Sequence, residues 1–311
     1  MYKIIFIGTP EFSVPTLEAL IADRRFEVLA VVTAPDAKIG RKQILTPPPV
    51  KVAAQKYKIP IIQPADIKSL PLALGERGQG VRVDVIIVIA YGQIIPPEIL
   101  TLPKYGCLNL HASLLPQYRG ASPIQAAIAA GDKITGITLM KMDAGLDTGP
   151  IIAQTKLNIA ANETGASLHD KLARLSAKTL LQYLPGYLAG KIKPKPQADA
   201  LVTYAPKLTR QSGRINWRKS AEAIERLVRA YHPWPGTWTK WDGKILKIIE
   251  VGKKNLPINK YKVGQFFLHN DRPAIQCGRS SLIISSLQLA GKNVLTGQEF
   301  ISGYKQKIEN C

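Results

Sequence analysis

The sequence predicts an α/β protein in which a Rossmann-like domain with a mostly parallel sheet is followed by a small OB-fold-like β-barrel domain. Three observations predict this fold class. Strand and helix signals alternate over residues 1–200, residues 83–90 are apolar in almost every position, and short β-rich segments dominate after residue 206. The 311 residues suffice for two hydrophobic cores. We expect a first domain at 1–189, a linker at 190–206 and a second domain at 207–311.

The expected first domain opens with a strand at residues 3–7, most of which are apolar. The run at 83–90 is typical of a strand buried on both faces of a parallel sheet. Further strands are expected at 28–32, 60–63, 106–111, 137–141 and 151–159, and helices at 14–22, 50–57, 122–130 and 167–188. The turn Gly8-Thr9-Pro10 lacks the Gly-x-Gly-x-x-Gly pattern, so a nicotinamide dehydrogenase is not expected.

Residues 190–206 interleave Lys191, Lys193 and Lys195 with prolines, which predicts an extended connection. The second domain is expected to hold a helix at 221–231 and strands at 237–241, 245–251, 263–267, 274–277 and 282–287. Several short strands separated by turn signals are typical of a small barrel, and the OB-fold is a nucleic-acid-binding barrel of this size.

Residues 34–49 show no regular periodicity and are too long for an ordinary strand-to-helix turn. The segment carries Lys38, Arg41 and Lys42 around Gly40. Its three cations could meet phosphates or base edges of a nucleic acid. A solvated surface loop is the alternative interpretation.

The charge balance points to a polyanionic partner. The chain has 42 basic and 22 acidic side chains, a net charge of +20, and a pI near 9.9. Residues 206–311 hold 19 basic and 7 acidic side chains, which is +12, whereas residues 1–205 hold 23 and 15, which is +8. A general compositional habit or a solubility device is the other explanation of so high a pI.

Three cysteines, Cys107, Cys277 and Cys311, have no paired or metal-type spacing, so neither a disulfide framework nor a metal site is expected. The apolar run at 4–7 is too short for a signal peptide, and no segment reaches the roughly 20 apolar residues that span a bilayer. We expect a cytoplasmic protein without membrane contact.

The segment around residue 109 contains the candidate catalytic residues. Strand alternation places Asn109 and His111 on one face of the expected strand at 106–111, and Asp147 follows within Asp147-Thr148-Gly149. A carboxamide, an imidazole and a carboxylate can transfer an acyl group to an amine without a covalent enzyme intermediate. Locally, a turn-forming Asn, a buried His and an Asp turn remain the plainer interpretation. Cys107 shares the face, but nothing nearby indicates thiolate activation, so we assign it to packing.

Four motifs spread over the chain resemble the formyltransferases that use 10-formyltetrahydrofolate, and among them the enzymes that act on methionyl-tRNA. The motifs are residues 6–12 (FIGTPEF), 109–120 (NLHASLLPQYRG), 142–150 (MDAGLDTGP) and 232–238 (HPWPGTW). The resemblance implies that the chain formylates the α-amino group of methionine on initiator methionyl-tRNA for translation initiation. It also implies the same two-domain fold, with the basic second domain binding tRNA. A monomer suffices for such a substrate, and no metal is implied.

The resemblance also implies roles for individual residues. Asn109 would stabilise an oxyanion, His111 would manage protons, and Asp147 would orient the imidazole or hold a water that relays the proton. Folate would be bound by Ile86, Ile89, Tyr91, Gly92, Ser113, Leu114, Leu115 and Pro116. The acceptor end of tRNA would be met by Lys38, Arg41, Lys42 and Arg119. Arg119 could instead hold its own loop in place.

Several alternatives share parts of this pattern. Formyltransferases that act on glycinamide ribonucleotide or on sugar nucleotides, and formyltetrahydrofolate hydrolase, would share Asn109, His111 and Asp147. The glycinamide ribonucleotide enzymes typically lack a basic second domain. A nucleic-acid-binding module on an inactive scaffold is the alternative from another class, and the presence of all three residues argues against it.

Overall fold

The structure is a computed structural model that describes residues 1–40, 42–70, 82–252, 256–257 and 260–309. It divides into two compact units. The first unit comprises Met1–Gly120, Ile134–Asn158 and His169–Tyr204; the second comprises Ala121–Lys133, Ile159–Leu168 and Ala205–Cys311. Two short segments that precede residue 189 therefore belong to the second unit. The domain boundaries at 189 and 206 stay a prediction.

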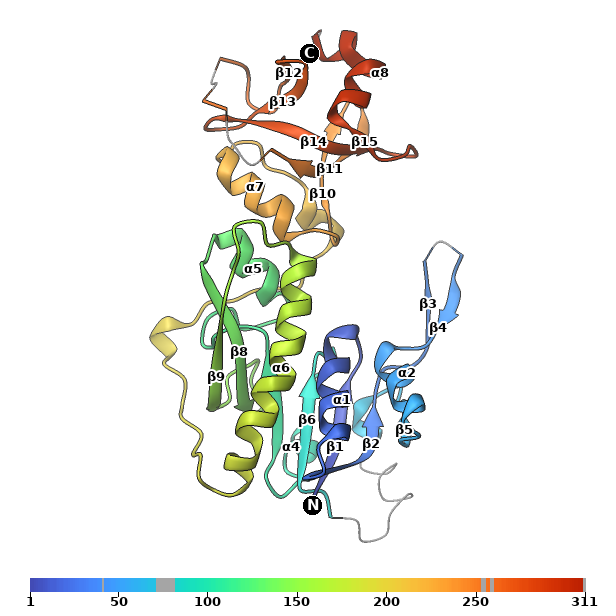
Figure 1. The fold of residues 1–311 in the computed structure, drawn as a ribbon, viewed down its shortest axis with the longest axis vertical. Coiled ribbons are helices and arrows are strands. Elements are labelled where there is room, and N and C mark those ends of the chain that lie inside the picture. The colour runs from blue at the N-terminus through green and yellow to red at the C-terminus, as the bar shows by residue number, and fades with distance from the viewer. Residues whose placement is uncertain (41, 71–81, 253–255, 258–259, 310–311) are drawn as a thin grey trace. The chain divides into compact units, whose positions relative to one another are not determined.

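The first unit is built on a seven-stranded sheet in the order β5-β2-β1-β6-β7-β8-β9 (Figure 1). The strands are β1 Tyr2–Gly8, β2 Phe26–Val32, β5 Ile61–Ile62, β6 Val85–Ile89, β7 Cys107–His111, β8 Ile134–Lys141 and β9 Ile151–Asn158. Pairing is parallel from β5 to β7, whereas β8 pairs antiparallel with β7 and with β9. This confirms the predicted mostly parallel α/β sheet.

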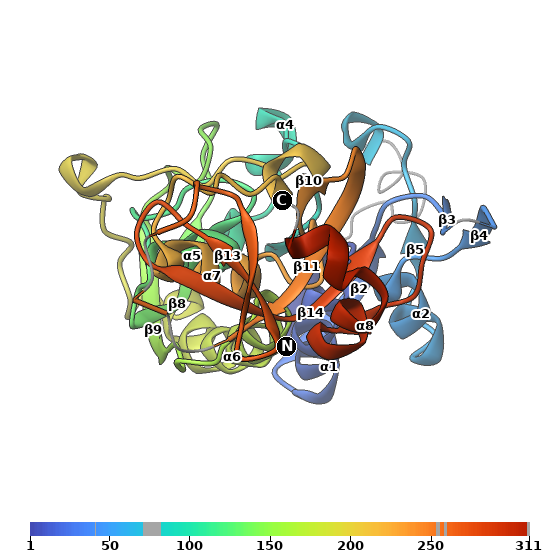
Figure 2. The same ribbon diagram turned by 90° about the horizontal axis from the view of Figure 1, so that it is seen from above.

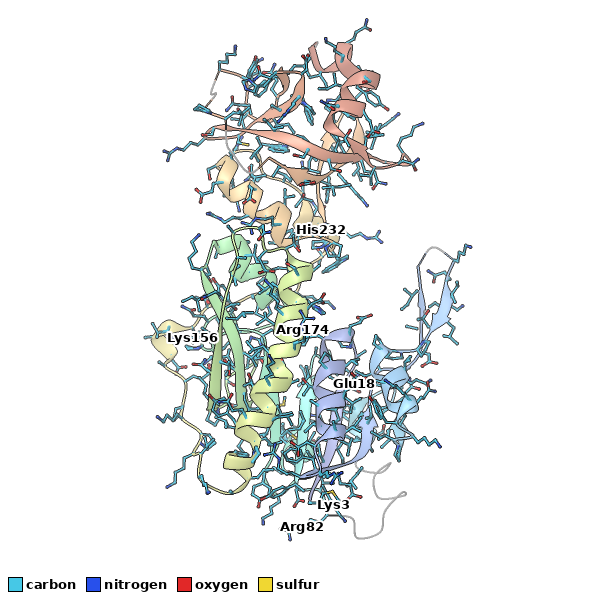
Figure 3. All side chains as sticks on the ribbon, in the orientation of Figure 1. Lys3, Glu18, Arg82, Lys156, Arg174 and His232 are labelled. Carbon is cyan, nitrogen blue, oxygen red and sulfur yellow. The ribbon has the colours of Figure 1, made fainter. Side chains whose placement is uncertain are left out.

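The sheet is buried where the sequence is apolar. All five residues of β6 are buried between β1 and β7, which explains the continuous apolar run. At the edge, side chains of β9 alternate between more and less buried positions, and Lys156 is exposed (Figure 3). Strand β9 thus shows the alternation of a strand with one solvated face.

Helices cover both faces of this sheet. The helical elements of this unit are η1 Glu11–Ser13, α1 Val14–Ala22, α2 Pro49–Lys56, η2 Ile67–Ser69, α4 Pro97–Leu100, η3 Asp199–Leu201 and α6 Gly165–Leu188, whose first four residues fall in the second unit. Helices α1 and α6 lie on one face of the sheet and α4 lies on the other (Figures 1 and 2). The expected helix at 14–22 is confirmed with the same bounds. In the described part of the chain, no helix has both the length and the apolar character needed to cross a membrane.

The second unit contains an antiparallel sheet in the order β10-β11-β14-β13-β12, with β15 paired to β14. Its strands are β10 Thr237–Trp241, β11 Lys244–Val251, β12 Phe266–His269, β13 Arg272–Gln276, β14 Ser281–Leu289 and β15 Leu295–Thr296. Its helical elements are α5 Pro123–Ala130, η4 Arg210–Gly213, α7 Ala221–Ala230 and α8 Gly297–Glu309. Among the described residues the strand pairing follows an open path, so closure into an OB-fold barrel stays a prediction.

An apolar core holds the second unit together. Trp241 packs against Phe266, Phe300 and Tyr304, with ring centroids 5.2–5.8 Å apart. Helix α7 begins after Ser220, whose hydroxyl accepts a hydrogen bond from the Ala223 amide at 3.2 Å. The core joins α7, α8 and the sheet, so the helix after β15 is part of the fold.

Three sequence expectations are wrong in detail. The segment 34–49 contains a hairpin, β3 Ala37–Ile39 and β4 Ile44–Thr46, whose side chains are mostly exposed, so no buried face gave a periodic signal. The strand expected at 263–267 begins at Phe266, because Gly264 adopts a φ of +85° beside Trp217. Helix α8 was not expected.

Candidate active site

Strand β7 supplies the first two residues of the site. His111 is buried at 6% exposure and Asn109 is half-buried. Strand β7 is parallel to β6, and β6 is parallel to β1, so these three strands end at one edge of the sheet. Asn109 and His111 therefore lie where ligands gather in open α/β sheets.

The His111 ring is held from one side by a backbone carbonyl. Its Nε2 lies 2.9 Å from the Tyr118 carbonyl oxygen, which can only accept, so Nε2 is the donor. In the neutral ring the lone pair is then on Nδ1. Nδ1 lies 3.6 Å from Asp147 Oδ1, which is close enough for ion pairing but too long for a good hydrogen bond. The basic nitrogen thus faces the carboxylate.

Asp147 joins the cluster from the loop between β8 and β9. Its backbone has a φ of +52°, which is uncommon outside glycine. Its Oδ2 accepts from the Gly120 amide at 2.9 Å, and its Oδ1 accepts from Asn109 Nδ2 at 3.4 Å. The structure therefore brings Asn109, His111 and Asp147 together, although Asp147 lies 36 positions beyond His111.

The loop that carries Asp147 is shaped by its neighbours. The Asp143 carboxylate accepts from the Gly145 amide at 3.0 Å and from the Thr148 hydroxyl at 2.5 Å. A Cβ at Gly149 would lie 1.8 Å from the Lys141 carbonyl oxygen, so only glycine fits there. The motif at 142–150 is thus a compact turn that delivers one carboxylate to the site.

A buried threonine fastens the segment of Ser113 to Pro116. The Thr138 hydroxyl donates to the Ser113 carbonyl at 2.7 Å and accepts from the Leu115 amide at 3.0 Å. Ser113 and Leu115 are buried, whereas Leu114 and Pro116 are partly exposed. Within this predicted folate-binding group, Leu114 and Pro116 are the more accessible side chains.

The predicted folate residues between 86 and 92 fall into two sets, one on β6 and one in the turn that follows it. Ile86 and Ile89 are fully buried, and β6 pairs with a strand on each side, so its backbone groups are largely occupied. The chain leaves the sheet at Ala90, which has a φ of +47°, and Gly92 is exposed with a φ of +88°. Of this group Gly92 is therefore accessible to a ligand, together with the neighbouring exposed Ala90.

Tyr91 lies in that turn and has a distinctive environment. It is 6% exposed, and among the described residues its hydroxyl has no hydrogen-bond partner. Burial raises the pKa of Tyr91, with a smaller contribution from Asp66. The hydroxyl is therefore protonated at neutral pH and can donate a hydrogen bond.

Arg119 differs from the other predicted tRNA contacts. Lys38 and Lys42 are exposed on or beside the β3–β4 hairpin, and Arg41 lies outside the described residues. Arg119 is 5% exposed, and its guanidinium contacts the side chain of Gln197 at 2.8 and 3.1 Å. This favours the interpretation that Arg119 holds its loop, and a tRNA contact by Arg119 stays a prediction.

Cys107 is buried, and its thiol donates to the Ile99 carbonyl at 3.4 Å. Burial raises its pKa to about 12, so the thiol is neutral at physiological pH. This agrees with a packing role. In the described part of the chain, no group of three or more His, Cys, Asp or Glu residues is arranged to hold a metal ion.

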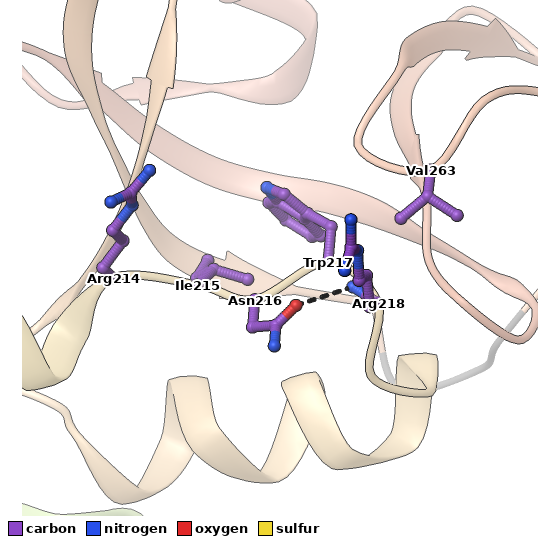
Figure 4. A pocket seen from close by; sticks show the side chains of 6 residues that line it. All are labelled: Arg214, Ile215, Asn216, Trp217, Arg218 and Val263. Atoms are coloured by element: carbon purple, nitrogen blue, oxygen red, sulfur yellow. Dashed lines mark hydrogen bonds between the residues drawn. The ribbon is translucent and has the colours of Figure 1, made fainter.

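The second unit has a cavity of about 520 Å³ with a basic and aromatic lining (Figure 4). It is lined by Arg214, Ile215, Asn216, Trp217, Arg218 and Val263. Arg214 and Arg218 are exposed, and the Trp217 indole N–H donates to the Thr239 hydroxyl at 3.0 Å. Cations beside a fixed indole are suited to phosphate and base contacts.

Residues 113–120 were expected to line the mouth of the site, with Tyr118 beside the acceptor, but the backbone roles of Tyr118 and Gly120 were missed, as were Thr138 and Gln197. Tyr118 and Gly120 act through backbone groups, which leave no mark on residue type. Thr138 lies on β8 opposite His111, and only strand register could have identified it. Gln197 lies in the segment interpreted as a linker and carries no local signal of a role.

Comparison with known proteins places this site in a family. The family described as Formyl transferase matches residues 2–184, and the one described as Formyl transferase, C-terminal domain, matches residues 207–305. Methionyl-tRNA formyltransferase of Citrifermentans bemidjiense is 44% identical over 306 residues, covering 97% of this chain and 94% of the relative. The same enzyme of Geobacter sulfurreducens is 43% identical with the same coverage.

A solved structure shares the fold at lower sequence identity. The N-formyltransferase of Helicobacter canadensis, in complex with folinic acid and dTDP-3-aminofucose, aligns with a TM-score of 0.65 and 19% identity. The alignment covers 91% of this chain and 99% of that one.

Proposed function

The chain belongs to the formyl transferase family, and on that premise we propose that it transfers the formyl group of 10-formyltetrahydrofolate to the α-amino group of methionine on initiator methionyl-tRNA. The observation that carries the proposal is the Asn109, His111 and Asp147 cluster at the end of β7, in a chain similar to methionyl-tRNA formyltransferases over nearly its whole length. Action on a charged tRNA in bacterial relatives accords with a cytoplasmic location.

The reaction needs a neutral amine, a stabilised oxyanion and a route for one proton. Attack of the α-amino group on the formyl carbon forms a C–N bond and a tetrahedral oxyanion. Collapse then breaks the bond to the folate nitrogen, and the amine proton must leave. Free α-amino groups titrate near 7.7 to 8.0, so a sizeable neutral fraction exists at physiological pH.

Asn109 is suited to the oxyanion. One N–H of its carboxamide is directed to Asp147 Oδ1 at 3.4 Å, and the second remains for a ligand. A preorganised donor of this kind typically contributes a factor of about 10² to 10³ in turnover. Asp147 fixes the plane of the carboxamide and so aims that second N–H.

His111 is suited to the proton. Because Nε2 donates to the Tyr118 carbonyl, Nδ1 is the nitrogen that takes up the amine proton. The imidazolium formed would lie 3.6 Å from the Asp147 carboxylate, which stabilises its charge. The same proton can then be returned to the departing folate nitrogen. A water held by Asp147 is the alternative carrier.

The folate co-substrate would be met by the turn after β6 and by the segment of Ser113 to Pro116. Backbone groups at residues 90–92 suit a ring with several donors and acceptors, and Leu114 with Pro116 offers apolar contact. Lys38, Arg41 and Lys42 would meet the acceptor end of tRNA. The second unit, with its surplus of positive charge, would bind the tRNA backbone.

Formylation assays with three acceptors test the proposal. Methionyl-tRNA, glycinamide ribonucleotide and a sugar-nucleotide amine are each incubated with 10-formyltetrahydrofolate and the full chain. We expect turnover with methionyl-tRNA alone. Turnover with another acceptor, or salt-sensitive tRNA binding without any turnover, would contradict the proposed function.

A further inference from the structure

Gln197 makes four hydrogen bonds at the back of the candidate site. Its Nε2 donates to the carbonyl oxygens of Asp147 and Gly149, each at 2.8 Å. Its Oε1 accepts from Arg119 Nη2 at 2.8 Å and from Arg119 Nε at 3.1 Å. Two carbonyls require the amide nitrogen and a guanidinium requires the oxygen, so the orientation of this carboxamide is determined by its partners.

Through these bonds Gln197 is linked to Asp147 at two groups, the backbone carbonyl and the carboxylate. On one side Gln197 holds the Asp147 carbonyl, where the backbone has the unusual φ of +52°. On the other side it holds Arg119, and the next residue, Gly120, donates its amide to Asp147 Oδ2 at 2.9 Å. A single side chain therefore fixes both the backbone and the carboxylate of Asp147.

The segment around Gln197 is itself tied to the first unit. Lys195 exchanges two backbone hydrogen bonds with Ile151, at 2.7 and 2.8 Å. The Thr203 carbonyl accepts from the Arg119 amide at 2.9 Å, and the Thr203 hydroxyl accepts from the Tyr118 amide at 2.8 Å. Residues 195–203 are thus anchored on both sides of Gln197.

We propose that Gln197 is a positioning residue for formyl transfer, which acts by holding Asp147 in the orientation that aligns Asn109 and His111. The inference rests on the proposed function, because Asp147 matters only if this cluster performs the reaction. Gln197 acts through other residues, because its four hydrogen bonds go to Arg119, Asp147 and Gly149. A misplacement of about 1 Å in such a group can reduce turnover by about 10²-fold.

Two variants separate this role from simple packing. Gln197→Leu removes all four hydrogen bonds, whereas Gln197→Glu keeps the length and the contact with Arg119 but cannot donate to Asp147 and Gly149. For both we expect kcat with methionyl-tRNA to fall by roughly 10- to 100-fold, while KM for both substrates changes by less than about threefold. Asp199→Asn is the matched control, since Asp199 is exposed and meets the same guanidinium only at 3.5 Å.

A double-mutant cycle with Asp147→Asn supplies the decisive measurement. If Gln197 acts through Asp147, adding Gln197→Glu to Asp147→Asn should reduce single-turnover rates by less than about twofold beyond Asp147→Asn alone. Losses that multiply would overturn the proposal, as would full activity of Gln197→Glu. An inactive wild type would overturn the proposed function together with the positioning role, whereas an active wild type with unaffected Gln197 variants would overturn only the latter.

Discussion

At the scale of single residues, loss of His111 should reduce turnover strongly and tRNA affinity very little. Its ring is buried and its Nε2 is bound to the Tyr118 carbonyl, which leaves Nδ1 for the reaction and little surface for contact with a large substrate. For His111→Ala we expect turnover to fall by roughly 10²- to 10⁴-fold in a single-turnover assay, with tRNA affinity nearly unchanged. His169→Ala is the control, since His169 pairs with Asp170 on α6 and should leave turnover intact. Near-normal turnover of the His111 variant would remove the proton-transfer role.

Asn109→Ala tests the oxyanion donor. The variant loses the N–H proposed to meet the developing charge and also one hydrogen bond to Asp147. We expect kcat to fall by about 10²- to 10³-fold with little change in KM for the folate co-substrate. A raised KM with unchanged kcat would indicate that Asn109 binds substrate in the ground state instead.

The buried cysteines give a prediction about pH. Burial raises the pKa of both Cys107 and Cys277 to about 12. At pH 8 both peptides should therefore escape iodoacetamide in the native protein and react after denaturation, as measured by mass spectrometry. Because the unfolded thiols ionise at lower pH than the folded ones, these two groups should make the free energy of unfolding fall as pH rises from about 9 towards 12. Rapid native labelling of Cys107 would show that its strand opens readily.

At the scale of elements, the β3–β4 hairpin stands out because its side chains are mostly exposed. Ile39, Ile44 and Leu45 are each more than half exposed, although they are large and apolar. Large apolar side chains beside cations suit a partner that offers both phosphates and base faces. The hairpin therefore suits the proposed contact with the acceptor end of tRNA.

Arg41→Leu tests this element. We expect lower kcat/KM with methionyl-tRNA and unchanged affinity for a folate analogue measured by calorimetry. Gln43→Leu, two positions further along the chain, should have a smaller effect because it removes no charge. An equal loss of folate affinity in the Arg41 variant would assign the hairpin to the donor site.

Elements with a buried face could be predicted from the sequence, and those without one could not. Strand β6 and helix α1 were located within two residues, because burial imposes their apolar patterns. The hairpin was missed because its strands have three residues each and exposed side chains. Helix α8 was missed because its apolar residues fit a core that only the assembled sheet defines.

The candidate site was predictable to a similar extent. Asn109 and His111 share a strand face, so alternation alone places them together. Asp147 required the turn that Gly149 permits, which local sequence does not specify. The role of Gln197 could not be predicted from the sequence. Its partners are two backbone carbonyls and a guanidinium, which only the folded chain brings near.

At the scale of the whole molecule, the two units are interleaved along the chain. Helix α5 and residues 159–168 precede the linker in sequence but belong to the second unit. Helix α5 packs against α7, and the Ala166 amide donates to the His232 carbonyl at 3.1 Å. Removing residues 207–311 would deprive α5 of its packing against α7. A truncated chain is therefore a poor test of where tRNA binds, and charge variants of the full chain are better.

The double variant Arg214→Gln/Arg218→Gln tests whether the second unit contacts the tRNA backbone. Both guanidinium groups are exposed beside the cavity of Figure 4. If each arginine contacts one phosphate, the slope of log K against log salt for tRNA binding should become shallower by about 0.7 to 0.9 per contact, or about 1.4 to 1.8 for the pair. Arg24→Gln/Arg25→Gln, which removes the same charge from the first unit, should change the slope far less because those residues directly precede β2 and lie outside both proposed tRNA contacts. Equal slopes for wild type and the Arg214/Arg218 variant would mean that the positive charge around this cavity does not bind tRNA, because loss of a phosphate contact must release fewer counterions.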